Sequence, residues 1–339
     1  MSTVRVGLMG FGRIGRNLFR ILYDRKDIQI AAIADVADHS SLEYLLRFDT
    51  ILGRFPDEVS IREGNLYVVG RQIPMLRAEG PADVRWDLLG VDYVIEATAR
   101  PRTRQELSQH LDTGARRVIL CAPPVEPPDI TVVMGVNDGD LGPDHRIVSN
   151  ASCTAHCAAP IIKMLHEAFG IEKAFLTTVH AYTNQQRLAD VPSADPRRGR
   201  AAAENIIPQE TNSADVIMEL LPQLRGRVSA MAMNVPVPNG SVVDLVCWHS
   251  KPVSKVALNE VVRTAASSHW RNLVKYEDEP IVSSDIVRSS YSSIFDSMAT
   301  MALEGRVSKT LAWYDNGFGY AHRVVDLIQR FARMDEEAA

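Results

Sequence analysis

The stretch that decides the fold is VRVGLMGFGRIGRNLFRILYDRKDIQIAAIAD, at residues 4–35. Its first six residues are β-prone, and the apolar residues that follow Gly12 recur at helical spacing. The run IQIAAIAD at 28–35 predicts a second buried strand. A strand, a glycine-rich turn, a helix and a second strand in direct succession predict one βαβ unit.

Three glycines mark the turn of this unit. Gly10, Gly12 and Gly15 form the pattern GxGxxG, directly after the first strand and at the start of the helix. In a dinucleotide-binding unit the first glycine permits the tight turn. The second lets the backbone approach a pyrophosphate, and the third allows the helix to pack closely on the strand. The free N–H groups at the helix N-terminus favour phosphate. Glycines also serve ordinary turns, so this pattern alone does not establish a cofactor site.

An acidic residue at the end of the second strand strengthens the cofactor interpretation. Asp35 closes that strand, at the distance from the glycines that dinucleotide-binding units show. A carboxylate at this position accepts hydrogen bonds from ribose hydroxyls and repels a 2′-phosphate. The sequence therefore predicts NAD as the cofactor rather than NADP.

The rest of the chain divides into two halves that differ in their pattern of predicted strands and helices. Its 339 residues suit two domains. Up to about residue 150, strands alternate with helices, which predicts a parallel sheet covered on both faces. The strands expected here include 91–98, TVVMGVN at 131–137 and HRIVSN at 145–150. Beyond a helix expected at 151–169, successive longer strands predict a mixed or antiparallel sheet.

Composition excludes several classes of protein. Hydrophobic residues make up 46% and charged residues 23% of the chain, which is typical of a globular protein. A net charge of -5 offers no global reason for nucleic-acid binding. No apolar run is long enough to span a bilayer, and the N-terminus does not resemble a secretion signal. Four cysteines in this length do not form a disulfide framework, which indicates the reducing cytosol.

The stretch SNASCTAHC at 149–157 raises the question of catalysis. Cys153 lies where a strand meets an expected helix N-terminus, a position that lowers the pKa of a thiol. Most free cysteines are instead buried small hydrophobes, so position alone leaves both interpretations open. Cys157 lies four residues further on, but no second pair of ligands follows at metal-site spacing, so no metal is expected.

Two histidines are candidates for a base that would activate Cys153. His156 shares a helix face with the cysteine, yet it is equally typical of a helix-surface histidine. His180 ends the strand-like run TTVHAYT and leads into a polar, arginine-rich loop at 183–208. Catalytic groups gather at strand ends in α/β proteins, which makes His180 the better candidate. The run RRGR in that loop is either a solvated basic segment or an anion-binding one.

Several separate motifs together carry a resemblance to a known family. In order and spacing the chain resembles phosphorylating glyceraldehyde-3-phosphate dehydrogenases, from about residue 4 to 332. The motifs are GFGRIGRN, SNASCT, VHAYTN, RRGRAAAENIIP, VPVPNGSVVDL and WYDN.

The resemblance implies a fold, an assembly and a catalytic pair. It implies an α/β fold with a Rossmann-type NAD-binding domain at 1–152 and an α+β catalytic domain with a mixed or antiparallel sheet at 153–318. A C-terminal helix at about 319–336 would pack back on the first domain. Cys153 would be the nucleophile and His180 the base. The family is typically a cytoplasmic homotetramer that binds no nucleic acid and no membrane.

The resemblance also implies binding residues for NAD, for the aldehyde and for inorganic phosphate. Asn316 would orient the nicotinamide amide. The cofactor-binding residues would be Gly10, Gly12, Arg13, Ile14, Gly15, Asp35, Thr98 and Asn316. The substrate- and phosphate-binding residues would be Ser152, Thr154, Thr183, Arg198, Thr211, Asn212 and Asn234.

The chain departs from the family pattern around the substrate phosphate. Asn234 stands where the family has an arginine that grips this phosphate. The usual Thr-Gly pair is Thr211-Asn212, a nearby lysine is Asp215, and STGRFT is ATARPRT at 97–103. An asparagine donates only neutral hydrogen bonds, so phosphate binding would weaken by about 1–3 kcal/mol unless another cation replaces the arginine.

Three functional hypotheses follow. The leading one is NAD-dependent oxidative phosphorylation of glyceraldehyde 3-phosphate to 1,3-bisphosphoglycerate through a Cys153 thioester. The second is the same chemistry on another aldehyde, such as erythrose 4-phosphate or a non-phosphorylated aldehyde, and Asn234 motivates it. The third is an NAD-binding or regulatory protein that has kept the fold and lost catalysis.

Overall fold

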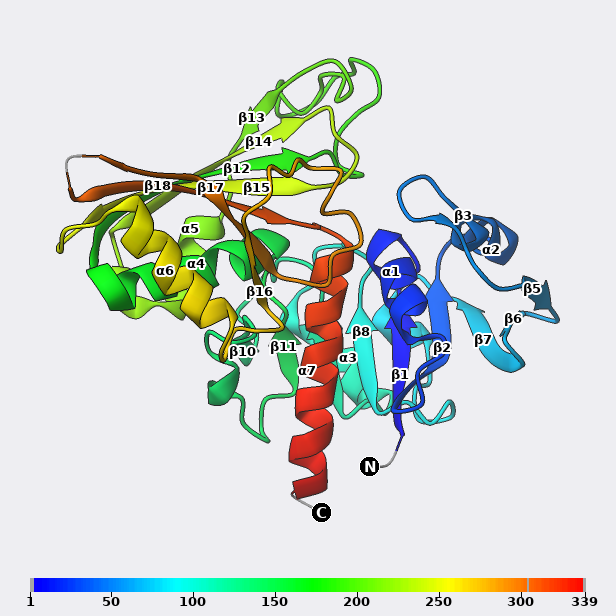
Figure 1. Cartoon of the computed structure of the whole chain (residues 1–339). Helices are drawn as coiled ribbons and strands as arrows, with labels where there is room; N and C mark the ends of the chain where they lie inside the picture. The colour runs from blue at the N-terminus through cyan, green and yellow to red at the C-terminus, as the bar shows by residue number, and fades with distance from the viewer. Residues whose placement is uncertain (1–2, 304, 338–339) are drawn as a thin grey trace. The chain divides into compact units, whose positions relative to one another are not determined.

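A computed structural model describes residues 3–303 and 305–337 of the chain (Figure 1). The chain divides into two compact units. The first unit runs to Val132, takes in Asp140–Ala151 and resumes at Ala321. The second unit comprises Val133–Gly139 and Ser152–Tyr320.

A nine-stranded sheet forms the core of the first unit, in the order β10-β11-β9-β8-β1-β2-β7-β6-β5. The strands from β10 to β7 are parallel, and β6 and β5 extend the sheet as an antiparallel meander. The central strands are almost wholly apolar, as burial on both faces requires. The bounds are β1 Val4–Met9, β2 Ile28–Asp35, β5 Val59–Arg62, β6 Asn65–Val68, β7 Arg71–Arg77, β8 Tyr93–Glu96, β9 Arg117–Leu120, β10 Ile130–Thr131 and β11 Ile147–Ser149.

The order of the strands reverses at β1, and this creates a binding crevice. From β1 the chain crosses through α1 (Arg13–Leu22) to β2, whereas β8 crosses through α3 (Arg104–Asp112) to β9 on the other side. Right-handed crossovers in opposite directions place the two helices on opposite faces of the sheet (Figure 1). Ligands of such sheets bind where the order reverses, at the carboxyl ends of the strands.

The remaining elements of the first unit follow these strands or contact them. The helix α2 (His39–Arg47) follows β2, and a two-stranded sheet of β3 (Phe48–Asp49) and β4 (Gly53–Arg54) follows it. The C-terminal helix α7 (Phe318–Glu337) contacts β8 and β9 through Asp335, which accepts a hydrogen bond from Tyr93 Oη at 2.6 Å and pairs with Arg117. A short 3₁₀ turn, Pro81–Asp83, follows β7, and another, Asp138–Asp140, lies at the boundary of the two units.

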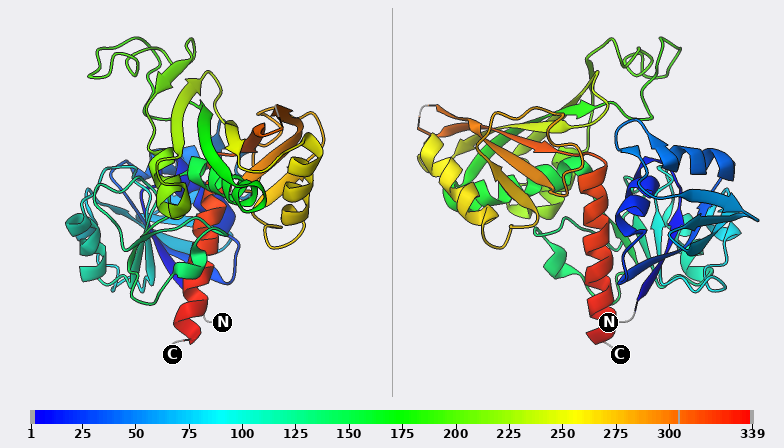
Figure 2. Two further views of the ribbon diagram at one scale, coloured as in Figure 1. Left: turned by 90° about the vertical axis from the view of Figure 1, so that its left-hand side faces the viewer. Right: turned by 45° about the vertical axis from the view of Figure 1, so that its right-hand side comes forward.

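A seven-stranded mixed sheet forms the second unit, in the order β13-β14-β12-β15-β18-β17-β16. Only the pairs β12–β14 and β16–β17 are parallel. Both figures show α4 (Cys153–Phe169), α5 (Ser213–Leu220) and α6 (Lys255–Ala266) on one face (Figures 1 and 2). The other bounds are β12 Ile171–Ala181, β13 Ile207–Gln209, β14 Val228–Val235, β15 Ser241–His249, β16 Val274–Glu277, β17 Ser293–Leu303, β18 Val307–Tyr314 and a 3₁₀ turn at Pro222–Leu224.

The fold class expected from the sequence is confirmed, with one strand that was predicted wrongly. The run TVVMGVN at 131–137 is not a strand, because β10 ends at Thr131. Gly135 adopts φ +81, and a Cβ there would lie 2.6 Å from the Trp270 ring. Lys163 Nζ also donates to the Val136 carbonyl at 2.9 Å. These contacts join residues 133–139 to the second unit, whereas the sequence placed them in the first domain.

Within the described part of the chain, no helix is both long and apolar enough to cross a membrane.

Candidate active site

The glycine-rich turn is shaped by close backbone contacts in the first unit. Gly10 has φ +99, and a Cβ there would lie 2.7 Å from the backbone of Ala97 and Thr98. A Cβ on Gly15 would lie 2.2 Å from the Gly10 carbonyl oxygen. Gly12 has nothing within 4 Å of its Cβ position. The first and third glycines are therefore required by packing, and the second leaves open space in which a ligand can approach the backbone.

The N-terminus of α1 offers free donors beside this space. Gly12 is the N-cap residue, and no side chain caps the helix. Arg13 and Ile14 are the next two residues and are half-buried. An uncapped N-terminus presents backbone N–H groups and the positive end of the helix dipole, which suits a pyrophosphate.

Asp35 is fixed by the backbone around the turn. Its Oδ2 accepts a hydrogen bond from Phe11 N at 2.6 Å, and its Oδ1 accepts one from Ala37 N at 2.9 Å. A cavity of about 110 Å³ lies beside it. Its lining includes Gly10, Gly12, Asp35, Glu79, Thr98 and Arg100. Four of the residues expected to bind NAD, namely Gly10, Gly12, Asp35 and Thr98, thus border one cavity within the first unit.

Cys153 is the first residue of α4 in the second unit. The preceding Ala151 has φ +48, a conformation that L-residues other than glycine rarely adopt. Ser152 is the N-cap, and its Oγ accepts a hydrogen bond from Ala155 N at 3.1 Å. Thr154 Oγ1 lies 2.9 Å from the buried hydroxyl of Tyr314. A strained turn, a cap and a tyrosine therefore fix the thiol at the positive end of the helix dipole.

His180, near the end of β12, lies next to this thiol. Its Nε2 is 3.6 Å from Cys153 Sγ, and its Nδ1 is 2.6 Å from the Ala181 carbonyl oxygen. A carbonyl can only accept, so Nδ1 carries the hydrogen. In the neutral ring Nε2 is then an acceptor and faces the thiol. This tautomer can take the proton of Cys153.

Two influences on the pKa of Cys153 oppose each other. Burial raises the pKa of the thiol to about 11, and hydrogen bonding from Thr154, at the start of α4, lowers it. Before substrate arrives, the pair is therefore best described as a thiol that donates to a neutral imidazole. Transfer of the proton to His180 Nε2 forms a thiolate beside an imidazolium, whose charge offsets the loss of solvation.

His156 and Cys157, the last two residues of the stretch SNASCTAHC, pack in the interior. The His156 ring packs edge-on against Tyr320, with ring centroids 6.0 Å apart. Cys157 is buried, 3.6 Å from Ser293 Oγ and 3.5 Å from the Ala312 carbonyl, and burial raises the pKa of its thiol to about 12. The described residues hold no group of three or more His, Cys, Asp or Glu side chains that could bind a metal.

The residues expected to bind phosphate have protein partners of their own. Thr183 Oγ1 donates to Gln186 at 2.9 Å, and Thr211 Oγ1 lies 2.8 Å from Ser213 Oγ. Arg198 pairs with Asp195 at 3.4 Å on the exposed loop. Thr211 also borders a cavity of about 350 Å³, which is lined by Arg197, Pro208, Gln209, Glu210, Thr211, Ala230 and Met231. Asn212 is the N-cap of α5, and its side chain makes no capping hydrogen bond.

Asn234 lies beside His180 but is tied to the protein. The two residues are register partners on β14 and β12, so their side chains share one face of the sheet. Asn234 Nδ2 donates to the Ala181 carbonyl at 3.3 Å, and its Oδ1 accepts from Gln209 Nε2. Its exposed fraction is 2%. The Asn234 amide, at the position where an arginine was expected, is therefore occupied by hydrogen bonds within the protein and does not face open solvent.

Three supporting residues were not singled out from the sequence. Asp315 is buried and accepts hydrogen bonds from Asn239 Nδ2, Arg288 N, Gly317 N and Phe318 N, at 2.7–2.8 Å. Ser241 Oγ accepts from Ala181 N at 3.1 Å and lies 3.3 Å from Asn316 Oδ1. Burial raises the pKa of Tyr314 well above its usual value, so its hydroxyl stays protonated. Asp315 and Tyr314 lie in the quoted motif WYDN, which gave the only sequence signal for them.

Comparison with known proteins agrees with the division of the chain into two units. Residues 4–104 match the family model "Glyceraldehyde 3-phosphate dehydrogenase, NAD binding domain". Residues 152–316 match the model "Glyceraldehyde 3-phosphate dehydrogenase, C-terminal domain". The fold and these matches define an oxidoreductase with an NAD-binding domain, which confirms the cofactor expected from Gly10, Gly12, Gly15 and Asp35.

Curated relatives extend the match to nearly the whole chain. A glyceraldehyde-3-phosphate dehydrogenase of Geobacillus stearothermophilus is 46% identical over 326 residues, which is 96% of this chain and 97% of the relative. One of Mycobacterium leprae is 47% identical over 333 residues, covering 96% and 98%. One of Streptomyces coelicolor is 47% identical over 328 residues, covering 96% and 97%. The chain belongs to the glyceraldehyde-3-phosphate dehydrogenase family, as its motifs predicted.

The contact between Cys153 and His180 predicts how the thiol reacts. In a His180→Asn variant we expect iodoacetamide to alkylate Cys153 at least about tenfold more slowly at neutral pH, because asparagine offers the thiol no basic nitrogen. In this variant no imidazole offsets the raised pKa of the Cys153 thiol, so the pH profile of the alkylation rate moves to higher pH. Mass spectrometry of the modified peptide across a pH series measures both effects.

The matched control is His156→Asn, which removes the other candidate base. Its alkylation profile should follow that of the unmodified chain, because His156 packs against Tyr320. Equal slowing in both variants, or none in His180→Asn, would show that His180 does not activate the thiol.

Proposed function

We propose that the chain catalyses the NAD-dependent oxidative phosphorylation of an aldehyde, with glyceraldehyde 3-phosphate as substrate and 1,3-bisphosphoglycerate as product. The observation that carries this proposal is the thiol of Cys153 at the start of α4, 3.6 Å from an acceptor nitrogen of His180. The names of the curated relatives support the substrate.

The reaction begins with attack of Cys153 Sγ on the aldehyde carbon. His180 Nε2 takes the thiol proton, and the carbonyl oxygen becomes an oxyanion. The backbone N–H of Cys153, in the first turn of α4, is placed to donate to that oxyanion. His180 then returns its proton to the oxygen and completes a thiohemiacetal.

Oxidation converts this thiohemiacetal into a thioester. His180 Nε2 accepts the hydroxyl proton as the carbonyl re-forms, and the carbon loses its hydride. NAD, when bound, supplies the hydride acceptor. Inorganic phosphate then attacks the thioester carbon, the C–S bond breaks, and the acyl phosphate leaves. The thiolate of Cys153 recovers the proton held by His180, and the pair returns to its starting state.

We assign the anion-binding roles to hydroxyl and guanidinium donors of the second unit. Ser152, Thr154, Thr211 and Arg198 are proposed for inorganic phosphate and Thr183 for the phosphate of the substrate. Ser152 keeps its hydroxyl hydrogen for a ligand, because its oxygen accepts from Ala155 N. Asn316 is proposed to orient the nicotinamide, and its Oδ1 already lies 3.3 Å from Ser241 Oγ.

Formation of NADH tests the reaction. With glyceraldehyde 3-phosphate we expect NADH to form only when phosphate or arsenate is present, and we expect Cys153→Ala to lower turnover at least about a thousandfold. Cys157→Ala is the matched control and should keep most of the activity, because Cys157 is buried against Ser293 and Ala312. Retained turnover in Cys153→Ala would rule out the thioester route.

A second candidate substrate is an aldehyde without a terminal phosphate. The observation that favours it is the pairing of Asn234 with Gln209 and with the Ala181 carbonyl, in place of the family arginine. Arg197 and Glu210 both border the cavity beside Thr211, so its lining carries one positive and one negative side chain. A neutral amide and a balanced charge pair would hold a phosphate less firmly than an arginine does.

A comparison of two aldehydes separates the candidates. If the substrate is glyceraldehyde 3-phosphate, its kcat/KM exceeds that of glyceraldehyde at least about tenfold. An Asn234→Arg, Gln209→Ala variant, in which the second change makes room, should raise this ratio roughly 5- to 150-fold, because a charge-assisted contact contributes about 1–3 kcal/mol. A ratio near one in the unmodified chain would favour the second candidate.

We further propose that the chain is a cytoplasmic homotetramer. The location is supported by four cysteines that are all free thiols. The assembly is supported by the open face of the seven-stranded sheet, which carries Phe175, Met231 and Trp248 on three adjacent strands, with exposed fractions of 57%, 40% and 38%. Phe175 and Trp248 are in edge-on contact, with ring centroids 5.9 Å apart. Contiguous exposed apolar residues of this kind are typical of an interface.

Light scattering tests the assembly. We expect the mass of a tetramer for the unmodified chain and smaller species for Phe175→Lys, Met231→Lys, because buried lysines without partners oppose association. Val256→Lys is the control, since Val256 is exposed on α6, away from the open sheet face. A monomeric unmodified chain at micromolar concentration would contradict the proposal.

A further inference from the structure

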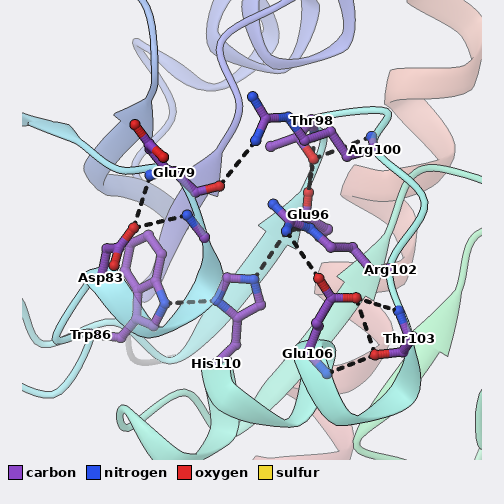
Figure 3. A network of polar contacts seen from close by, with 11 residues as sticks. Glu79, Asp83, Trp86, Glu96, Thr98, Arg100, Arg102, Thr103, Glu106 and His110 are labelled. Atoms are coloured by element: carbon purple, nitrogen blue, oxygen red, sulfur yellow. Dashed lines mark hydrogen bonds and ion pairs between the residues drawn. The ribbon is translucent and has the colours of Figure 1, made fainter.

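A buried carboxylate lies beneath the cofactor cavity of the first unit. Glu96 ends β8 and is 1% exposed. Its Oε1 accepts hydrogen bonds from the backbone N of Thr98, at 3.1 Å, and from Thr98 Oγ1. Its Oε2 lies 3.1 Å from His110 Nε2 on α3 (Figure 3). Both oxygens of the carboxylate are therefore occupied, one by donors of the segment that follows β8 and the other by a donor of α3.

The direction of these hydrogen bonds is set by Trp86. Its indole Nε1 donates to His110 Nδ1 at 3.0 Å, and an indole nitrogen can only donate (Figure 3). His110 Nδ1 is thus the acceptor, and the hydrogen on Nε2 is directed at Glu96. Trp86 and His110 are both fully buried, so this chain of donors is held in place by packing.

Arg102 supplies a charge opposite to that of Glu96. Its Nε lies 3.8 Å from Glu96 Oε2, and its Nη1 donates to Glu106 at 3.5 Å. The side chain is 7% exposed. A buried carboxylate is tolerated when it is paired and hydrogen-bonded, and Glu96 meets both conditions.

The donors of Thr98 connect this cluster to the wall of the cavity. Thr98 and Gly10 both line it, and the Ala97–Thr98 peptide lies so close to Gly10 that no Cβ fits there. The next residue, Ala99, has φ +57, and a left-handed conformation in an L-residue persists only when its surroundings impose it. Arg100 then donates from Nη1 to the Glu79 carbonyl at 3.1 Å, and both residues line the same cavity.

We propose that Glu96 is a positioning residue for NAD, which holds the Thr98 peptide and the strained Ala99 in the conformation that shapes the cofactor cavity. His110, oriented by Trp86, and Arg102 keep its carboxylate in place. The inference rests on NAD binding by the first unit, which is part of the proposed function. It adds residues that need not touch the cofactor themselves.

Direct titration of the purified chain with NAD tests this role. In Glu96→Gln we expect the dissociation constant for NAD to rise at least about tenfold, because one amide oxygen cannot accept from both Thr98 and His110. The value of kcat at saturating NAD should stay within about twofold. A merely structural role would instead lower the folded fraction and kcat and leave the dissociation constant unchanged, and that result would overturn the proposal.

The matched control removes a second carboxylate that contacts Arg102. Glu106→Gln keeps the cap on α3, since glutamine can also accept from Thr103 N, and NAD affinity should be unaltered. An equal loss of NAD affinity in both variants would overturn the proposal, because the loss would then follow from removing any negative charge near Arg102. Should Glu96→Gln fail to fold, Glu96→Asp keeps the charge with a shorter reach, and an unchanged affinity there would also overturn it.

Relief of the strain at Ala99 gives a rescue experiment. Glycine adopts positive φ without strain, so Ala99→Gly added to Glu96→Gln should recover much of the lost affinity. No recovery would count against the proposal. An unmodified chain that binds NAD without oxidising any aldehyde would refute the proposed function and leave this inference standing. An unmodified chain that does not bind NAD would refute both.

Discussion

The hydrogen bond between His180 Nδ1 and the Ala181 carbonyl oxygen, 2.6 Å long, decides which ring nitrogen can receive the Cys153 proton. Ala181 is itself held in place, because its N–H donates to Ser241 Oγ at 3.1 Å. The same carbonyl accepts from Asn234 Nδ2 at 3.3 Å. A backbone group at the end of a central strand thus sets the tautomer of the imidazole. If that carbonyl turned away, Nε2 could carry the hydrogen and would no longer accept one from the thiol.

The protein gives the thiol an environment that favours reaction over permanent ionisation. Burial favours the neutral thiol, whereas the start of α4 and a protonated His180 favour the thiolate. Because the acceptor nitrogen is in place before substrate arrives, the proton needs to move only between Sγ and Nε2. Thr154 and the buried hydroxyl of Tyr314 hold the first turn of the helix at this distance.

The sequence predicted correctly those glycines whose role depends on the turn in which they lie. Gly15 could be assigned from spacing because the contact that excludes its side chain, with the Gly10 carbonyl oxygen, lies within the turn, and Gly10 because its φ of +99 belongs to the turn itself. The same reasoning failed at 131–137, where the apolar run resembled a strand. Gly135 packs against Trp270 and Leu273, which lie more than a hundred residues further along the chain. No local pattern carries that information.

The supporting groups of the site were hidden for a similar reason. Glu96 and His110 are neighbours only because α3 packs close to the end of β8. The role of Trp86 depends on which nitrogen of His110 accepts its hydrogen bond. The partner of Asn234 could not be predicted either, since Gln209 reaches it only through the pairing of β13 with β14. Motif spacing identifies residues within an element, whereas sheet topology decides which elements become neighbours.

The second sheet gives Gln209 and His180 different numbers of neighbouring strands. Gln209 lies on β13, the edge strand, which pairs only with β14. His180 lies on β12, which has a partner on each side and packs beside α4. A substitution on an edge strand disturbs one neighbour, whereas a change on β12 would alter the distance from His180 to Cys153. A change at Gln209 can therefore alter the partner of Asn234 without moving the thiol or its base.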